Sequence, residues 1–301
     1  MDKIFQIGAF CFRLFCAEEI PVPENFLLFE SDRVTEPQYT YTFQSSETLP
    51  EPTGSVVARR PDLVVFREDS GTQEGKKDNT ALESRLIGVK GTEGYYACYR
   101  ETGPDCAEVY LARDRIDGLH FDPMFTSLLA LERRMIRKDS LILHCAYMVY
   151  HGEAILFSAP SETGKTTQAN LWETYLGGRT VNGDRALLGK IDGRWNAQGW
   201  PVCGTSEVCS DEAFPIRAIV MLSQAKENLA VRMTPGQAFP LLYSQITVNR
   251  WNMQDHLHAM DLMEKLLAEV PVYHLGCTIS EEAVECLENA LRQEEPNGRR
   301  E

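Results

Sequence analysis

The side chains best suited to chemistry lie close together in one segment, residues 158–167. In order they are Ser158, Ala159, Pro160, Ser161, Glu162, Thr163, Gly164, Lys165, Thr166 and Thr167. A loop around a polyphosphate must turn its backbone N–H groups inward, and Gly164 permits the dihedral angles that this requires. Lys165 can neutralise the outer phosphates, and the Thr166 hydroxyl can ligate the accompanying magnesium ion. We therefore predict a phosphate-binding loop, with residues 161–167 around the anion.

The spacing of this segment follows the pattern G-x-x-x-x-G-K-[ST], except that Ala159 stands at the first position. An apolar run at 154–157 precedes the loop and predicts a strand. Apolar residues then recur at helical spacing, namely Ala169, Leu171, Trp172, Tyr175 and Leu176. A helix that begins near Lys165 directs its positive dipole end at a bound phosphate. A chance match within a turn is the alternative, and the flanking strand and helix disfavour it.

Two further candidates for chemistry flank the loop in sequence. Asp184 follows about one helix downstream, at the end of a short predicted strand that begins at Arg179. A carboxylate there can hold magnesium or accept the proton of an attacking hydroxyl. The alternative is that Asp184 is only a turn residue in a Gly-Asp hairpin. His144 stands at the entry to the strands before the loop, where a role in the site and a structural role are equally open. His151-Gly152 is interpreted as a turn.

Composition sets limits on the class of protein. The chain has 301 residues, of which 43% are hydrophobic and 25% charged, which is typical of a globular protein with a substantial core. A formal net charge of -14 argues against nucleic-acid binding, because such proteins need a basic surface. We find no segment suited to span a membrane, and the apolar run at 4–16 is interpreted as a strand rather than a signal peptide. The nine cysteines include no C-x-x-C pair, which favours reduced thiols in a cytoplasmic protein.

The elements that must position these residues suggest two domains. Residues 1–121 alternate apolar and polar positions and predict a small antiparallel β domain of five to eight strands, whose role the sequence does not indicate. Asp122-Pro123 predicts the start of a helix with Asp122 as N-cap. We expect one side of this helix to pack in the core and the other to be a solvated basic face. The solvated face is formed by Glu132, Arg133, Arg134, Arg137 and Lys138. Residues 122–293 form the second predicted domain, which ends in helices, and 294–301 form a charged tail.

Aromatic and histidine residues near the C-terminus were weighed as additional site residues. Trp251, beside Asn249 and Arg250, could stack on a nucleobase, although ordinary aromatic packing is favoured. His256 and His258 lie two apart, on different sides of any helix, and are interpreted as surface or packing residues.

Taken together, His144, the loop at 161–167 and Asp184 resemble the C-terminal catalytic domain of HPr kinase/phosphorylase, within the phosphoenolpyruvate carboxykinase-like P-loop fold. That family has a histidine at the start of a strand, a hairpin, a P-loop that opens a helix, and a short strand ending in Asp-Asp. Asp184 matches the second Asp, whereas Gly183 stands where the first would be. The chain is most similar to uncharacterised HPr kinase-like members, in which a β-rich N-terminal part precedes the kinase-like core.

The resemblance implies a fold and a function. The fold class is α+β or α/β, with a β-rich N-terminal domain followed by a P-loop kinase core and C-terminal helices. The function is an ATP-dependent kinase that transfers a phosphoryl group to a serine hydroxyl of a peptide, small protein or metabolite. Lys165, Asp184 and His144 would be catalytic, Thr166 and Asp184 would hold Mg2+, and Glu207 is the nearest match to a downstream acidic segment of the family. Relatives are often homo-oligomers.

Two other functions remain open at this point. A non-catalytic nucleotide-binding regulatory or accessory module is favoured by Ala159, by Gly183 and by the substantial β domain. A phosphoenolpyruvate carboxykinase-type decarboxylating enzyme is weaker, because the chain lacks the length and the second metal-binding cluster that such chemistry is expected to need. Transfer of phosphate to a defined acceptor distinguishes a kinase from the regulatory module.

Overall fold

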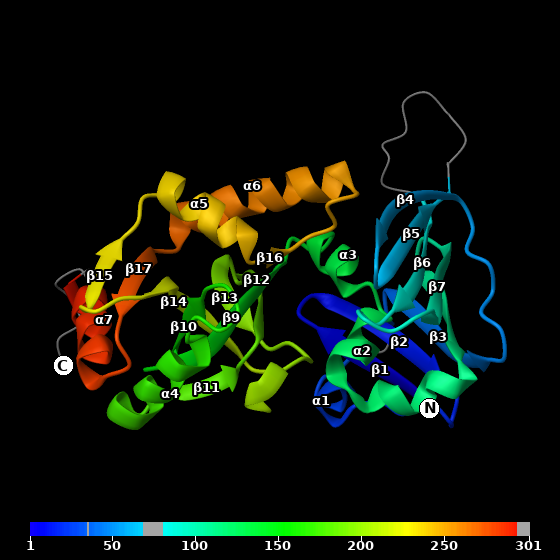
Figure 1. The fold of residues 1–301 in the computed structure, drawn as a ribbon, viewed down its shortest axis with the longest axis horizontal. Helices are drawn as coiled ribbons and strands as arrows, with labels where there is room; N and C mark the ends of the chain where they lie inside the picture. Colours follow the sequence, from blue (N-terminus) through cyan, green and yellow to red (C-terminus); the bar gives the residue numbers. More distant parts are fainter. Residues whose placement is uncertain (35, 69–80, 294–301) are drawn as a thin grey trace. The chain divides into compact units, whose positions relative to one another are not determined.

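The computed structural model describes residues 1–34, 36–68 and 81–293, and the chain separates into two compact units (Figure 1). The first unit contains Met1–Arg134 and Asn249–Asp255, and the second contains Met135–Val248 and His256–Glu301. The predicted charged tail, 294–301, lies outside the described residues. Residues 122–134 and 249–255 pack with the first unit. The functional domains predicted at 1–121 and 122–293 stay a prediction.

The first unit is built on one sheet, in which the described residues contribute eight strands in the order β1-β2-β3-β8-β7-β6-β5-β4. The strands are β1 (Asp2–Ile7), β2 (Phe10–Cys16), β3 (Tyr39–Ser46), β4 (Ser55–Arg60), β5 (Leu63–Arg67), β6 (Glu83–Gly88), β7 (Tyr95–Gly103) and β8 (Cys106–Ala112). The predicted strand number is confirmed. The prediction of a wholly antiparallel sheet is wrong, because β3 runs parallel to both β2 and β8. The long connection from β2 to β3, which includes α1 (Glu24–Leu27), makes such a crossover possible.

The predicted helix at Asp122 is interrupted and differs from the expectation. After a 3-10 segment (Arg113–His120), α2 (Asp122–Ser127) and α3 (Leu131–Ile136) are separate helices, and Ala130 between them has φ of 47°. Phe121 is the N-cap of α2, so the prediction of Asp122 as N-cap is wrong. The predicted solvated basic face is also wrong, since Arg133 is 2% exposed and Arg134 is 4% exposed.

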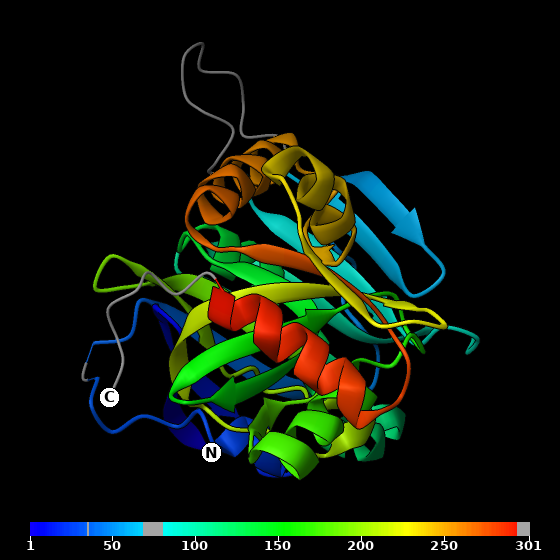
Figure 2. The ribbon, with the colours of Figure 1, turned by 90° about the vertical axis from the view of Figure 1, so that its left-hand side faces the viewer.

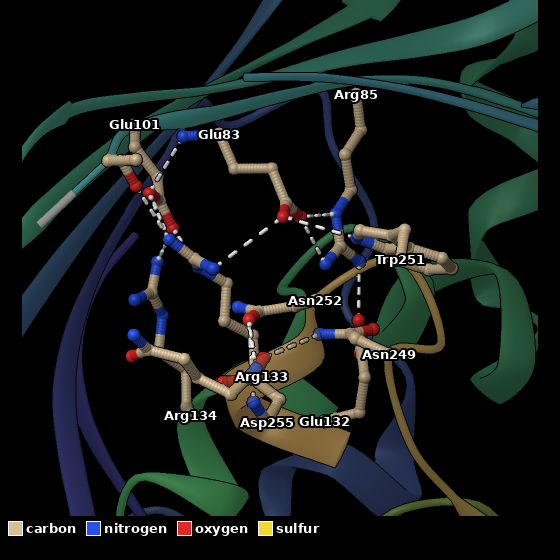
Figure 3. A network of polar contacts seen from close by, with 12 residues as sticks. Glu83, Arg85, Glu101, Glu132, Arg133, Arg134, Asn249, Trp251, Asn252 and Asp255 are labelled. Carbon is tan, nitrogen blue, oxygen red and sulfur yellow. Dashed lines mark hydrogen bonds and ion pairs between the residues drawn. The ribbon is translucent and has the colours of Figure 1, made fainter. Parts of the chain in front are cut away.

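These two arginines are buried because they meet carboxylates of the sheet (Figure 3). Glu101 accepts a hydrogen bond from Arg133 Nε at 2.9 Å and another from Arg134. Arg85 pairs with Glu83 and, at 2.6 Å, with Glu132. Burial alone raises the pKa of Glu101, but the charges of Arg134 and Arg133 outweigh it and lower that pKa to about 2. The buried charges of this network are therefore balanced.

Residues 249–255 join the same network from far along the chain (Figure 3). Trp251 Nε1 donates to Glu83 Oε2 at 3.3 Å, and the Arg85 guanidinium lies 5.6 Å from the centre of the Trp251 ring. Asn249 and Asp255 are buried beside them. The packing interpretation of Trp251 is thus confirmed.

The second unit contains a sheet with the main strand order β10-β9-β12-β13-β14-β17-β15, in which β11 and β16 also pair with β9. Its strands are β9 (Leu141–Tyr150), β10 (Glu153–Ser158), β11 (Arg179–Asn182), β12 (Arg185–Ile191), β13 (Arg194–Gln198), β14 (Ala213–Gln224), β15 (Leu229–Arg232), β16 (Ile246–Thr247) and β17 (Val272–Cys277). Strand β14 is parallel to both β10 and β17. The predicted turn at His151-Gly152, which joins β9 to β10, is confirmed by φ values of 51° and 75°.

Helices cover both faces of this sheet, because its strands alternate between two hydrophobic clusters. In β10, Leu156 packs in one cluster and Phe157 in the other. The first cluster includes residues of α5 (Pro235–Ser244) and α6 (Met253–Glu269), and the second includes residues of α4 (Lys165–Leu176) and α7 (Glu281–Gln293). Figure 2 shows α7 lying across the sheet. The chain therefore has a mixed α/β architecture with two large sheets.

Within the residues that the structure describes, no helix combines the length and apolar character needed to cross a membrane.

Candidate phosphate-binding site

The predicted loop lies between β10 and α4, as the sequence pattern indicates. Gly164 is the N-cap of α4 and has φ of 112°, a conformation that glycine adopts with little strain. No described atom lies within 4 Å of the position of a Cβ at Gly164, so the backbone conformation, not crowding, favours glycine there. Among the described residues no side chain caps α4, which leaves N–H groups of its first turn available to an anion.

The position of the loop in the sheet also suits ligand binding. It follows the carboxyl end of β10, which pairs in parallel with β14, and β14 pairs in parallel with β17. Ligands of α/β sheets bind outside the carboxyl ends of parallel strands. Gln168 of α4 donates to Thr278 O at 3.2 Å, just after β17 ends, so the start of α4 is tied to this edge of the sheet.

Lys165 is the most buried charged residue of the predicted loop, with 8% of its surface exposed. Its Nζ donates to Ala159 O at 3.0 Å and to Pro160 O at 3.2 Å. Burial lowers the pKa of Lys165, and the nearby negative charge of Asp184 acts in the opposite direction. The ammonium group is thus held over the loop, where a phosphate could replace the carbonyl oxygens as its partner.

The other predicted loop residues differ in exposure. Ser161 and Glu162 are exposed, whereas Thr163, Thr166 and Thr167 are half-buried. Thr163 Oγ1 donates to Pro160 O at 2.9 Å and so helps to close the loop. Phosphate contacts by residues 161–167 stay a prediction.

Asp184 lies in the short turn between β11 and β12, so the strand before it ends at Asn182. The fully buried Asn182 shapes this turn. Its Oδ1 accepts the N–H groups of Asp184 and Arg185, both at 2.9 Å, and its Nδ2 donates to Trp200 O at 2.8 Å. Sequence reasoning missed this role, although an Asn two residues before Asp is a recognisable side-chain turn signal.

Three of the predicted site residues come together around this turn. His144 Nε2 lies 3.7 Å from Asp184 Oδ1, and Arg185 Nε lies 3.0 Å from Asp184 Oδ2. On its other side, His144 Nδ1 lies 3.3 Å from Gln245 Oε1. Burial lowers the pKa of His144, the Lys165 charge lowers it further, and the Asp184 charge raises it. His144, Lys165 and Asp184 are therefore electrostatically coupled, and the net effect lowers the pKa of His144.

Gly183 and Glu207 are two other residues that the family resemblance singled out. Gly183 lies in the turn between β11 and β12, and Glu207 follows the 3-10 turn Gly204–Ser206. Gly183 is adjacent to Asp184, and a Cβ at that position would collide with Oγ and Cβ of Ser206. Glu207, the weak match to an acidic segment, is exposed and has φ of 57°. His256 is half-buried, with Nδ1 2.6 Å from Tyr243 Oη, and the exposed His258 pairs with Asp139 at 2.8 Å, which confirms their surface and packing roles.

The predicted magnesium ligands, Thr166 and Asp184, offer oxygen atoms of the kind that Mg2+ prefers, and their joint coordination of the ion stays a prediction. In the described part of the chain, no group of three or more His, Cys, Asp and Glu side chains is arranged to hold a metal by itself. Protein-bound Mg2+ commonly uses one or two protein ligands and completes its shell with phosphate oxygens and water. The predicted pair, Thr166 and Asp184, supplies a hydroxyl and a carboxylate of the required kind.

The coupling around His144 gives a prediction for the protein without nucleotide or metal. The pKa of His144 is expected below its usual value of about 6.5. Lys165→Met should raise this pKa, because a neighbouring positive charge is lost, whereas Asp184→Asn should lower it further. An NMR titration of the His144 ring protons in the wild type and in both variants measures all three values. Shifts of the same sign in both variants would contradict the arrangement.

Comparisons with known proteins cover parts of the chain. The family model described as "SynChlorMet cassette protein ScmC" matches residues 117–292, which include the loop and Asp184. Among solved structures, the Hpr(Ser) kinase/phosphatase from Coxiella burnetii is similar with 10% sequence identity and a TM-score of 0.32, over 52% of this chain and 99% of that chain. At this TM-score the likeness supports no argument about the site. No curated protein matches the sequence.

Proposed function

The chain belongs to the SynChlorMet cassette protein ScmC family, and for the site within the matched residues we propose an ATP-dependent phosphotransferase. It would transfer the γ-phosphoryl group of ATP to a serine hydroxyl of a peptide, a small protein or a metabolite. The observation that carries this proposal is the convergence of Lys165, Asp184 and His144 beside a glycine-capped helix N-terminus.

In this proposal each residue has a distinct task. The loop amides and Lys165 hold the β- and γ-phosphates, while Thr166 and Asp184 hold the magnesium ion. The bound magnesium ion supplies charge neutralisation at the phosphates. The acceptor oxygen forms a bond to the γ-phosphorus, the bond from that phosphorus to the bridging oxygen breaks, and ADP leaves. The acceptor proton passes to the Asp184 carboxylate, whose Oδ1 lies 3.7 Å from His144 Nε2, so that His144 can take the proton onward.

Most of the rate enhancement would then come from positioning and electrostatics. Asp184 is suited to both, because its backbone is fixed by Asn182 and its two carboxylate oxygens face different partners, His144 and Arg185. The buried position of Lys165 strengthens its interaction with phosphate relative to a lysine in water.

One observation favours the second candidate, a nucleotide-binding regulatory module. Ser206 fills the space that a side chain at position 183 would need. The turn therefore has no carboxylate at position 183 beside that of Asp184. A site with fewer acid/base groups could bind ATP and order a partner surface without transferring phosphate.

The discriminating experiment is Asp184→Asn, with Asp192→Asn as a matched control. Asp192 lies in the exposed turn between β12 and β13 with φ of 50°, which asparagine tolerates well. Calorimetry should show that the wild type and both variants bind Mg-ATP. Transfer of labelled phosphate from ATP to a library of serine peptides should fall roughly 100-fold or more in Asp184→Asn alone.

The outcomes separate the candidates. Retained transfer in Asp184→Asn would contradict the assigned role of Asp184. Binding of ATP without transfer to peptides, proteins or small hydroxyl compounds would favour the regulatory module. Failure of the wild type to bind any nucleotide would refute both functions.

A further inference from the structure

We propose that Ser206 belongs to this binding site, and that its hydroxyl oxygen faces the magnesium-bound end of the nucleotide beside Asp184. The inference rests on the proposed nucleotide site and adds a residue from a distant segment, the connection between β13 and β14. No sequence motif points to Ser206, which lies in a 3-10 turn, Gly204–Ser206.

The side chain of Ser206 lies against Gly183. Gly183 is absent from the residues with positive φ, so its conformation is open to other residues. Space is what restricts it, because a Cβ there would collide with Oγ and Cβ of Ser206 and would lie 3.5 Å from Cys203 O. The Ser206 side chain therefore occupies the volume that a side chain at position 183 would take.

The same segment also packs on Asp184. A Cβ at Gly204 would lie 3.1 Å from Asp184 Cβ and 3.3 Å from Asp184 Oδ1, which is a tight approach. Gly204 has φ of 61°, so glycine suits this position for conformation as well as for space. Both residues of the Gly183-Asp184 turn are thus in close contact with the segment 203–206, which places the Ser206 hydroxyl at the edge of the site.

The hydrogen bonds of the Ser206 hydroxyl limit what it can bind. Ser206 Oγ donates its proton to Cys203 O at 2.7 Å and accepts the N–H of Val208 at 3.3 Å. A serine hydroxyl has one donor and two acceptor lone pairs, so an acceptor lone pair remains. With its donor engaged, the oxygen suits a cation or a metal-bound water and does not suit a phosphate oxygen. Hydroxyl and water oxygens are ligands that Mg2+ prefers.

The test compares ATP binding with and without magnesium in Ser206→Ala, Ser206→Cys and the control Ser210→Ala. Ser210 lies in the same connection, but its hydroxyl bonds to Glu212 at 2.9 Å. Calorimetry with ATP in magnesium and with ATP in a chelator measures the gain in affinity that magnesium provides. We expect this gain to fall roughly tenfold in Ser206→Ala, with binding in the chelator unchanged. Ser206→Cys keeps the shape of the side chain with a larger sulfur atom, and it should show the same loss, because sulfur is a poor ligand for magnesium.

A second pair of variants tests whether the side chain of Ser206 leaves no space for a side chain at position 183. Gly183→Ala alone should lower ATP affinity and the melting temperature, whereas Gly183→Ala with Ser206→Gly should recover the melting temperature but not the magnesium-dependent gain. If magnesium increases the ATP affinity of Ser206→Ala and Ser206→Cys as much as that of the wild type, the inference is overturned. The proposed function then still stands, provided that the wild type binds ATP. Normal stability and binding in Gly183→Ala would overturn it as well. If the wild type binds no ATP, the inference and the proposed function both fail.

Discussion

Lys165→Ala is expected to reduce the affinity for Mg-ATP by at least about 100-fold, because it removes a buried charge that would pair with phosphate. The ammonium group has only two loop carbonyl oxygens as hydrogen-bond partners among the described residues, Ala159 O and Pro160 O. Neutral carbonyls satisfy it less well than a phosphate would. Its lowered pKa also indicates that burial, not a strong ion pair, dominates its surroundings before nucleotide binds. Calorimetric titration with Mg-ATP measures the loss.

Lys190→Ala is a suitable control for this prediction. Lys190 belongs to the same unit and pairs with Glu269 at 2.6 Å, but 40% of its side chain is exposed, so its removal should leave ATP binding unchanged. Circular dichroism should show intact folding in both variants, because the lysine contacts in the loop are few. An unchanged affinity in Lys165→Ala would mean that this loop is not the phosphate site.

The second large effect is expected for stability, in Arg134→Ala. Arg134 is 4% exposed and donates to Glu101 and to the hydroxyls of Tyr39 and Tyr99. Loss of one partner from a buried ion pair costs about 3–5 kcal/mol. In Arg134→Ala only Arg133 remains to compensate Glu101, and the hydroxyls of Tyr39 and Tyr99 lose their charged partner. Because Arg134 lies in the first unit, we expect the melting temperature of that unit to fall. Hydrogen exchange of the amides in β7 measures this loss of stability. Mg-ATP binding by the second unit serves as a check that its site is unaffected.

Arg13→Ala is the matched control. Arg13 also forms two hydrogen bonds to a carboxylate, that of Asp2, at 2.8 and 2.7 Å, but 43% of its side chain is exposed. Exposed ion pairs contribute about 0–1 kcal/mol, so its removal should have little effect. Equal losses of stability in Arg134→Ala and Arg13→Ala would contradict the inference that burial makes the Arg134 ion pair important.

The pH dependence of stability provides an independent check on the same network. The folded pKa of Glu101 is lowered to about 2, so its stabilising contribution is present above its unfolded pKa of about 4.3 and is lost as pH falls toward 2. In Arg134→Ala the pKa of Glu101 should rise, and acid unfolding of the first unit should begin at a higher pH than in the wild type. Acid titration followed by circular dichroism measures this shift.

Local patterns were enough to predict the central part of the site. The apolar run at 154–157, the glycine at 164 and the helical spacing from Ala169 to Leu176 correctly predicted strand, loop and helix, because each of these signals acts within a few residues. The turn at His151-Gly152 was predictable for the same reason, whereas the mixed α/β class was implied by the family resemblance. Turn residues and hydrophobic periodicity report the local backbone directly.

Only the tertiary structure decided which distant residues meet. The charged residues Arg133 and Arg134 suggested a solvated helix face, yet they are buried because Glu83 and Glu101, on strands far away in sequence, compensate their charge. The family resemblance placed His144 and Asp184 in one site, and the sheet pairing of β9 with β12 brings them together. The contact between Ser206 and Gly183, made by the connection after β13, was not predicted. Periodicity cannot specify such contacts, since burial of a charge depends on a partner that only the folded chain supplies.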